Sequence, residues 1–296
     1  MVTQTNAPVD PASWQFAEGD YIFHELTAVT LLGGGYRTEA WLAWHARLHC
    51  HVVAKLIRPD QVDDARARDS MAREAAVLQT IQHPAVVRCF GGDPAGARPH
   101  LVLEALDGPR LSSLLRRFGS LAPEQVVGLA LNIASALAYM HDMEYVHLDV
   151  KPRNLIMGAS PRLIDLGIAR RFEELAQLSS PVGTDAYMAP EQCALETLAQ
   201  VGPWSDVWGL SATVYEAISG RLPFERGDGT ERFPQLTASA SSLGGRVPDE
   251  IRQLVLAGLQ REPRQRPQLD DLIEALELLY PAARSVARGR MRRRRR

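Results

Sequence analysis

HLDVKPRN, residues 147–154, places a carboxylate at Asp149, an ammonium at Lys151 and a carboxamide at Asn154. These three groups suit phosphoryl transfer, because an aspartate accepts the proton of an attacking hydroxyl, a lysine neutralises the moving phosphate and an asparagine binds magnesium. A structural alternative is that His147 and Asp149 only cap the helix expected just before them. The rest of the chain has to decide between the two interpretations.

Size and composition bound the class of protein. The 296 residues, 46% of them hydrophobic, are enough to bury a large core in one bilobal domain or in two small ones. No apolar run reaches the roughly 18 to 20 residues that span a bilayer, and the N-terminus lacks a targeting signal. Cys50, Cys89 and Cys193 are odd in number and widely spaced, which fits a reducing compartment. We therefore expect a cytoplasmic protein with no transmembrane segment in this chain.

The basic residues are distributed unevenly between the two side-chain types. Of the 33 Lys and Arg residues only two are lysine, Lys55 and Lys151. Arginine cannot replace a compact ammonium at a phosphate without changing reach and geometry. The two lysines therefore mark places where a point charge matters.

The chain is expected to begin with strands and to continue with helices. Residues 1–20 are rich in Pro and polar residues, which predicts a loose lead-in. After it, periodicity predicts strands at 21–32, 40–44, 51–57, 86–90 and 100–106, with one helix at 60–82. The second half predicts helices at 110–118, 123–142, 205–219, 248–259 and 267–279, with short strands at Ile156 and Ile164. This order indicates a small antiparallel sheet followed by a mainly helical half.

Three further motifs suit nucleotide chemistry. LGGGYRTEA, residues 32–40, can bring backbone N–H groups close to phosphate, although three glycines are equally typical of a flexible turn. Lys55 in VVAK precedes Glu74 by 19 residues, a spacing that suits a strand lysine paired with a helix glutamate. An ordinary surface salt bridge is the alternative, but such a pair needs no particular lysine. Asp165 opens DLG, 16 residues after Asp149.

Together with MAPE at 188–191, these motifs resemble, in order, those of the bacterial eukaryotic-like (Hanks-type) serine/threonine protein kinases. The similarity runs from about Leu32 to about Leu279. Leu148 stands where the family has arginine, and Thr38 stands where it has the third glycine. Small-molecule kinases of the aminoglycoside type share an H-x-D loop, but they lack the A-P-E element.

The resemblance implies an α+β, two-lobe protein-kinase fold, with an N-lobe at 21–108 and a C-lobe at 109–280. It implies transfer of the ATP γ-phosphoryl group to protein Ser or Thr hydroxyls, in signalling and with autophosphorylation, using ATP and Mg²⁺, or Mn²⁺ in its place. It assigns catalysis to Asp149, Lys151, Lys55 and Glu74; metal binding to Asn154 and Asp165; and substrate docking to Thr184. It assigns ATP contacts to Leu32, Gly33, Gly35, Ala40, Ala54, Lys55, Leu103, Glu104, Leu106 and Ile156.

Other assignments follow from the same resemblance. Asp206 matches the aspartate that anchors the catalytic loop, and Arg266 matches the buried partner of Glu191. Ser179 and Ser180 are the expected phosphate acceptors of the activation segment. A pseudokinase that binds nucleotide or partners without transfer is the alternative function; Leu148 and the altered glycine-rich loop favour it, whereas the complete set of catalytic residues opposes it.

Two charged or ligand-like stretches remain. Residues 281–296 hold eight arginines and no acid, a run expected to be disordered and to attract anionic lipid, nucleic acid or the protein's own acidic surface. If the tail binds anionic lipid, we expect the protein to be peripheral to a membrane. The alternatives are that the tail is only solvated, or that it is a juxtamembrane stretch whose membrane helix lies beyond this chain. His45, His49, Cys50 and His51 suggest zinc, but strand alternation puts Cys50 on the opposite face from its neighbours.

Overall fold

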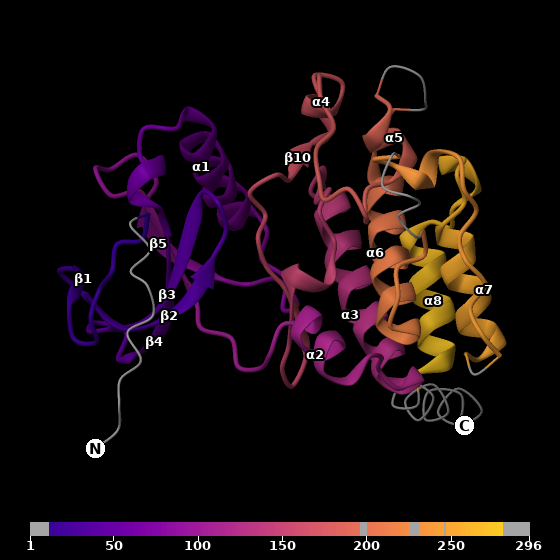
Figure 1. Ribbon diagram of the computed structural model, residues 1–296, viewed down its shortest axis with the longest axis horizontal. Helices are drawn as coiled ribbons and strands as arrows, with labels where there is room; N and C mark the ends of the chain where they lie inside the picture. Colours follow the sequence, from indigo (N-terminus) through magenta and orange to yellow (C-terminus); the bar gives the residue numbers. More distant parts are fainter. Residues whose placement is uncertain (1–11, 196–199, 225–230, 246, 281–296) are drawn as a thin grey trace, which may run out of the picture. The chain divides into compact units, whose positions relative to one another are not determined.

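The computed structural model describes residues 12–195, 200–224, 231–245 and 247–280 (Figure 1). They form two compact units, one of residues 12–80 and 87–105 and the other of residues 81–86 and 106–280. The chain enters the second unit after Ala105 rather than after residue 108. Residues 81–86 belong with the second unit because the Leu163 N–H donates to the Ala85 carbonyl at 2.7 Å.

The first unit is a six-stranded antiparallel sheet, in the order β1-β2-β3-β4-β6-β5, with one long helix. Its elements are β1 (Tyr21–Phe23), β2 (Leu26–Gly34), β3 (Thr38–His45), β4 (Cys50–Ile57), α1 (Ala65–Thr80), β5 (Cys89–Asp93) and β6 (His100–Glu104), with a 3-10 turn at Pro59–Gln61. The helix begins later than residue 60, since the Asp64 carboxylate accepts the Arg66 N–H at 2.9 Å and caps the first turn.

Alternation of side chains gives this sheet two different faces. Trp41 and Ala43 of β3 pair with Ala54 and Val52 of β4, and all four are buried in one apolar cluster with Leu56. Trp14 and Phe16 pack against this cluster from outside the sheet. The described part of the expected loose lead-in, residues 12–20, therefore covers one face of the sheet.

The second unit is mainly helical, as expected. Its helices are α2 (Leu111–Phe118), α3 (Pro123–Asp142), α4 (Phe172–Leu175), α5 (Pro190–Cys193), α6 (Pro203–Ser219), α7 (Asp249–Gly258) and α8 (Leu269–Leu279). Short antiparallel pairs join β7 (Tyr145–Val146) to β10 (Arg170–Arg171) and β8 (Leu155–Met157) to β9 (Pro161–Leu163). Further 3-10 turns lie at Pro152–Asn154, Pro234–Leu236 and Pro263–Gln265.

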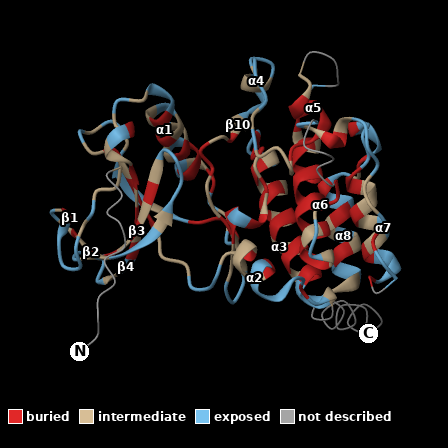
Figure 2. Ribbon diagram, viewed as in Figure 1, coloured by how far each residue is buried: buried red, intermediate tan, exposed pale blue. Residues whose placement is uncertain are grey.

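Helix α6 is the centre of this unit, and most of its length is buried (Figure 2). It ends at Gly220, whose left-handed φ of 76° and N–H bond to the Glu216 carbonyl form an αL cap. Gly258 of α7 lies so close to α6 that an added Cβ would be 1.9 Å from Ser211 Oγ. This glycine therefore permits the close approach of the two helices.

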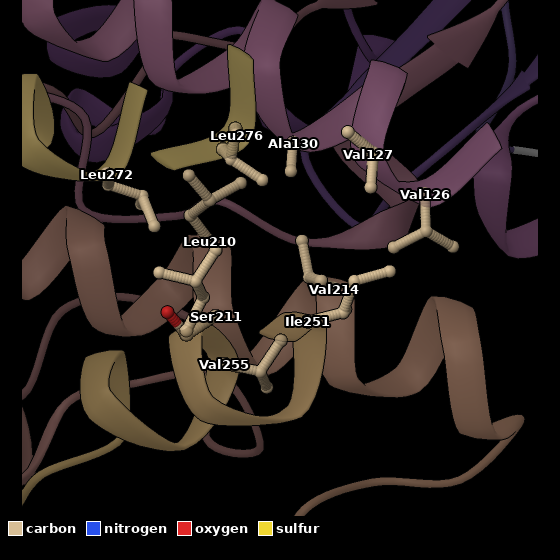
Figure 3. Close-up of a pocket in the computed structure, with 11 residues that line it drawn as sticks. Val126, Val127, Ala130, Leu210, Ser211, Val214, Ile251, Val255, Leu272 and Leu276 are labelled. Carbon is tan, nitrogen blue, oxygen red and sulfur yellow. The ribbon is translucent and has the colours of Figure 1, made fainter. Parts of the chain in front are cut away.

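Helices α3, α6, α7 and α8 surround a small cavity of about 20 Å³ (Figure 3). Aliphatic side chains such as Val126, Leu210, Val214 and Leu276 line it, and Ser211 is the only polar side chain among its lining residues. A water molecule needs two to four polar partners, so we expect this space to stay dry. It is a packing defect of the helical core.

None of the helices in the described ranges is both long and apolar enough to span a bilayer. The expected Arg-rich tail, 281–296, lies outside the described residues. Its contacts with lipid or nucleic acid stay predictions from charge.

Candidate active site

The first unit contains the expected pair of a strand lysine and a helix glutamate. Lys55 Nζ of β4 lies 2.6 Å from Glu74 Oε2 of α1. Only 2% of the Glu74 side chain and 15% of the Lys55 side chain are exposed to solvent. A pair this buried does not resemble an incidental surface salt bridge, which excludes the structural alternative for this motif.

The register of the sheet corrects one expected nucleotide contact. Lys55 pairs with Ala40 and with Leu101, and Val53 pairs with Leu103, so all five lie on one face. Ala54 is fully buried on the other face, in the cluster with Trp41. Because successive strand side chains point to opposite faces, Val53 and not Ala54 shares the face of Lys55.

The glycine-rich turn lies between β2 and β3 in an exposed hairpin. Gly33 has a φ of +125°, which only glycine adopts readily, and the Gly35 N–H donates to the Thr38 carbonyl at 2.8 Å. A Cβ on Gly34 would be 2.7 Å from that same carbonyl. Leu32, just before the turn, is about half exposed.

Several of the expected ATP contacts lie at the end of β6 and in the connection from it to α2. Leu103 is 7% exposed, and the Glu104 N–H donates to the Arg88 carbonyl at 2.9 Å. Leu106 is half-buried, and Ile156 of β8 bridges to Arg110. These residues belong to both units, so the structure leaves their common role as adenine contacts a prediction.

Asp206 fixes the backbone of the catalytic loop in the second unit. Its buried carboxylate accepts the N–H of His147 and of Leu148, each at 2.8 Å, and lies 2.9 Å from His141 Nε2. Leu148 has a φ of +67°, a left-handed conformation that is strained for a leucine. The aspartate holds the loop in this conformation from the first turn of α6.

Asp149 is surrounded by three of the residues named from sequence. Lys151 Nζ donates to Asp149 Oδ2 at 2.6 Å, and the Thr184 hydroxyl donates to Asp149 Oδ1 at 2.7 Å. The Asn154 amide nitrogen donates to Oδ2 at 3.0 Å. Lys151 also donates to Thr184 Oγ1 at 2.6 Å. Lys151 of the loop and Thr184 of the docking turn are 33 residues apart in the chain, yet both contact the Asp149 carboxylate.

The two expected metal ligands, Asn154 and Asp165, lie on two backbone segments that are joined by a hydrogen bond. The Ile164 N–H donates to the Asn154 carbonyl at 2.9 Å, and Asp165 comes next in the chain with a φ of +68°. The Asn154 amide nitrogen faces Asp149, so its carboxamide oxygen is the atom left for a cation. Among the described residues no group of three or more His, Cys, Asp or Glu can hold a metal ion. A metal site at Asn154 and Asp165 therefore stays a prediction.

Buried amides hold the segment that carries Thr184. Gln192 Nε2 of α5 donates to the carbonyls of Leu148 and Val182, at 3.0 and 2.9 Å. Gln235 Nε2 donates to the carbonyls of Asp185 and Met188, at 2.7 and 3.0 Å. Neither glutamine was identified from sequence, since an isolated glutamine carries no motif.

A buried ion pair closes the far end of the same segment. Arg266 binds Glu191 through two bonds of 2.7 and 2.9 Å, and neither side chain is more than 1% exposed. Ser205 Oγ also donates to Glu191 at 2.7 Å. The partnership expected from the A-P-E element is therefore present.

The protein kinase domain family matches residues 26–276 of the chain. The chain belongs to this family. Its relatives include serine/threonine-protein kinase PknD of Mycobacterium tuberculosis, 32% identical over 249 residues that cover 80% of this chain and 36% of the relative. The probable serine/threonine-protein kinase PkwA of Thermomonospora curvata is 32% identical, covering 84% and 33%. PknB of Mycolicibacterium smegmatis is 30% identical, covering 86% and 44%. The chain thus spans less than half the length of these relatives.

Within this kinase domain the departure at Leu148 has a visible structural consequence. Leu148 is 4% exposed and clusters with Val146 and Val201. Partly buried hydrophobic side chains pack on the cluster, namely Ile168, Leu175, Leu178 and Leu195. An apolar contact therefore joins the catalytic loop to the segment after the D-L-G turn. Sequence reasoning missed it because the contributing residues are far apart in the chain.

His147 completes the loop as a fully buried group. Its Nδ1 accepts the Asp149 N–H at 3.2 Å. Burial lowers the pKa of His147, an effect that the neighbouring carboxylates of Asp206 and Asp149 oppose. Through its bond to the Asp149 N–H, the ring supports the loop.

The residues of the suggested zinc cluster lie around the β3–β4 turn. Trp44 packs edge-on against His51, with ring centroids 5.4 Å apart. Cys50, Cys89 and Cys193 are all free thiols. None of these cysteines belongs to the arrangement around Asp149.

Proposed function

We propose that this chain is an ATP-dependent protein serine/threonine kinase, and that the alternative of a catalytically inert pseudokinase does not apply. The observation that carries the proposal is the set of bonds around Asp149. A carboxylate with a lysine at one oxygen and a hydroxyl at the other is arranged as in a working transfer site. Membership of the family and the named relatives support the same activity.

Asp149 takes the proton in the reaction that we propose. The substrate hydroxyl oxygen forms a bond to the γ-phosphorus, the bond from that phosphorus to the β–γ bridging oxygen breaks, and ADP leaves with the bond's electrons. The hydroxyl proton passes to Asp149, whose Oδ1 already accepts a hydroxyl hydrogen bond from Thr184. Lys151, two residues on, balances the negative charge of the moving phosphoryl group.

Two pairs of residues would hold the nucleotide and its metal: Lys55 with Glu74, and Asp165 with Asn154. Lys55, kept in place by Glu74, binds the α and β phosphates. Mg²⁺, or Mn²⁺ in its place, supplies neutralisation of phosphate charge when bound, and Asp165 and the Asn154 oxygen are its protein ligands. Both ligand types are oxygens, as these hard cations prefer. Thr38, which stands where the family has the third glycine, still accepts the Gly35 N–H through its backbone carbonyl.

A serine or threonine acceptor follows from Lys151 and Thr184. The 2.6 Å bond between them gives the site a compact cationic centre next to the proton acceptor. Signalling and autophosphorylation are further parts of the proposal, and incubation of the purified chain with ATP and Mg²⁺ alone tests the latter.

Replacement of Asp149 by asparagine tests the chemical assignment. Asp149→Asn keeps the size of the side chain but removes the proton acceptor, so we expect kcat to fall by ~10² to 10⁴-fold. Binding of ATP, measured by calorimetry, is expected to stay within about twofold. Asp165→Asn should instead weaken the Mg²⁺ dependence of nucleotide binding, and Asp270→Asn, on the exposed surface of α8, serves as the control. Retention of more than about a tenth of parent activity in Asp149→Asn would sink the assignment.

A further inference from the structure

Residues 12–20 form what we call the N-terminal strap, and aromatic contacts fasten it to the first unit. The Arg98 guanidinium lies over the Trp14 ring at 4.4 Å and over the Phe16 ring at 5.3 Å. Phe16 in turn packs edge-on against Trp41, with centroids 5.3 Å apart. Arg98 is itself fixed by a 2.6 Å bond from Nη1 to the Ile22 carbonyl. The strap is thus anchored on the face of the sheet opposite Lys55.

Glu39 connects the strap to the base of the glycine-rich hairpin. It is the second residue of β3, where it pairs with Gly34 of β2, and only 2% of it is exposed. Its Oε1 accepts the Trp14 backbone N–H at 3.1 Å and Trp41 Nε1–H at 2.8 Å. A carboxylate buried on a sheet is costly unless it is hydrogen-bonded. The strap supplies one of the two donors to this oxygen.

Arg58 connects the strap to the tip of the hairpin. Its Nε donates to the Ala12 carbonyl at 3.0 Å, and its Nη1 donates to the Gly35 carbonyl at 3.2 Å. The Arg58 backbone N–H donates to the Arg37 carbonyl at 3.0 Å. One residue therefore bonds to both sides of the turn while its guanidinium also holds the strap.

Trp14 also bonds to the chain next to Arg58, so it joins the connection through Glu39 to the connection through Arg58. Its Nε1–H donates to the Ile57 carbonyl at 2.8 Å, directly before Arg58 in the chain. The strap consequently contacts the hairpin base through Glu39 and the hairpin tip through Arg58. The turn itself is exposed and contains three consecutive glycines, so it has little intrinsic rigidity.

We propose that the N-terminal strap is a positioning device for the glycine-rich turn, acting through the positioning residues Glu39 and Arg58 to preorganise the turn for the phosphates of the nucleotide. The inference rests on the proposed kinase function. The strap touches no substrate, because it covers the face opposite Lys55. It raises nucleotide affinity by reducing the freedom that the turn loses on binding.

The strap is tested with Trp14→Ala, Trp14→Phe and Arg58→Ala in the full chain. Trp14→Ala and Arg58→Ala should raise the KM for ATP by about tenfold, the factor that one ordinary hydrogen bond supplies, with kcat within about twofold of the parent. Trp14→Phe loses the indole bond to the Ile57 carbonyl but keeps a ring over Arg98 and the backbone bond to Glu39, so its KM for ATP should lie between those of the parent and Trp14→Ala. Trp44→Ala, an aromatic loss in β3 away from the strap, is the matched control.

Hydrogen exchange of the free protein gives a second readout that needs no activity. The amides of residues 33–38 should exchange faster in Trp14→Ala and Arg58→Ala than in the parent or in Trp44→Ala. If the parent is active, and Trp14→Ala and Arg58→Ala both leave the KM for ATP and the amide exchange rates unchanged, the strap inference alone is overturned. A parent that neither binds ATP nor transfers phosphate overturns the kinase proposal, and with it the nucleotide role of the strap, whatever the exchange data show.

Discussion

At the scale of single residues, both lysines of the chain occupy positions that a compact ammonium fits. Lys55 reaches one oxygen of a buried carboxylate, and Lys151 reaches Asp149 and Thr184 at 2.6 Å each. A guanidinium is planar and larger, and it presents its donors in a fixed fork. In a chain that otherwise uses arginine, composition therefore singled out two lysines that the structure pairs with carboxylates.

Substitution of Lys55 by arginine tests this interpretation. Lys55→Arg keeps the charge but cannot make the same contact with Glu74, whose carboxylate is only 2% exposed. We expect kcat to fall at least about tenfold, the equivalent of about 1.4 kcal/mol, with the melting temperature close to the parent. The control is Arg47→Lys, in a surface pair with Glu25. Unchanged turnover in Lys55→Arg would mean that the scarcity of lysine is a coincidence.

Ala54 shows where residue-level prediction from motifs is wrong. The resemblance of VVAK to the family's strand motif places Ala54 beside the nucleotide. Strand alternation, which can be counted in the sequence, puts Val53 on the face of Lys55. The identity of the charged residues was therefore predictable, and the identity of their apolar neighbours required the register of the sheet.

At the scale of elements, the activation segment is attached by apolar contact. Leu175 and Leu178 pack on the cluster that contains Leu148. The arginines that might have received a phosphate are otherwise engaged. Arg170 donates to the carbonyls of Ile168 and Ala169, and Arg171 lies 3.3 Å from the Glu173 carboxylate. Partly buried leucines thus attach the segment to the catalytic loop at Leu148, where the resemblance places an arginine.

Alanine at both expected phosphate acceptors should therefore have little effect. For Ser179→Ala with Ser180→Ala we predict initial rates within about threefold of the parent, including protein treated first with a phosphatase. A charge-assisted hydrogen bond is worth about 1.5 to 3 kcal/mol, so a phosphorylation switch would cost about tenfold or more. Leu178→Ala, which thins the apolar cluster, is the matched variant and should lower the rate. A tenfold loss in the double variant that Glu at both positions restores would contradict the prediction.

Long helices were predictable from sequence, and short pairings were not. The apolar stripe and Pro123 predicted a helix over 123–142, and Gly220 marked the end of α6. The strand expected at 86–90 is instead β5 at Cys89–Asp93, displaced because residues 81–86 bind the second unit. Two-residue strands such as β7 and β10 carry no periodic signal, since tertiary contacts alone create them.

At the scale of the whole molecule, one fully buried and two partly buried histidines link stability to pH. Burial lowers the pKa of His100 in the first unit and of His83 and His147 in the second. Below the ordinary pKa of about 6.5 the unfolded chain binds more protons than the folded one, so these groups stabilise the fold above pH 6.5 and lose that contribution as the pH falls. Glu216 has the opposite effect, because burial raises its pKa and its contribution is lost as the pH rises.

The variant His147→Phe isolates the contribution of one histidine to the pH dependence of the unfolding free energy. His147 is fully buried, so its replacement should make the slope of the unfolding free energy between pH 5.5 and 6.5 shallower by up to about 1.4 kcal/mol per pH unit. The variant also leaves the Asp149 N–H without its acceptor, which lowers stability at every pH but does not change the slope. Denaturant unfolding at a series of pH values measures both quantities. Leu155→Val, a buried change with no titrating group, should shift the curve in parallel. A parallel shift in His147→Phe as well would show that His147 binds protons in the fold as it does in the unfolded chain.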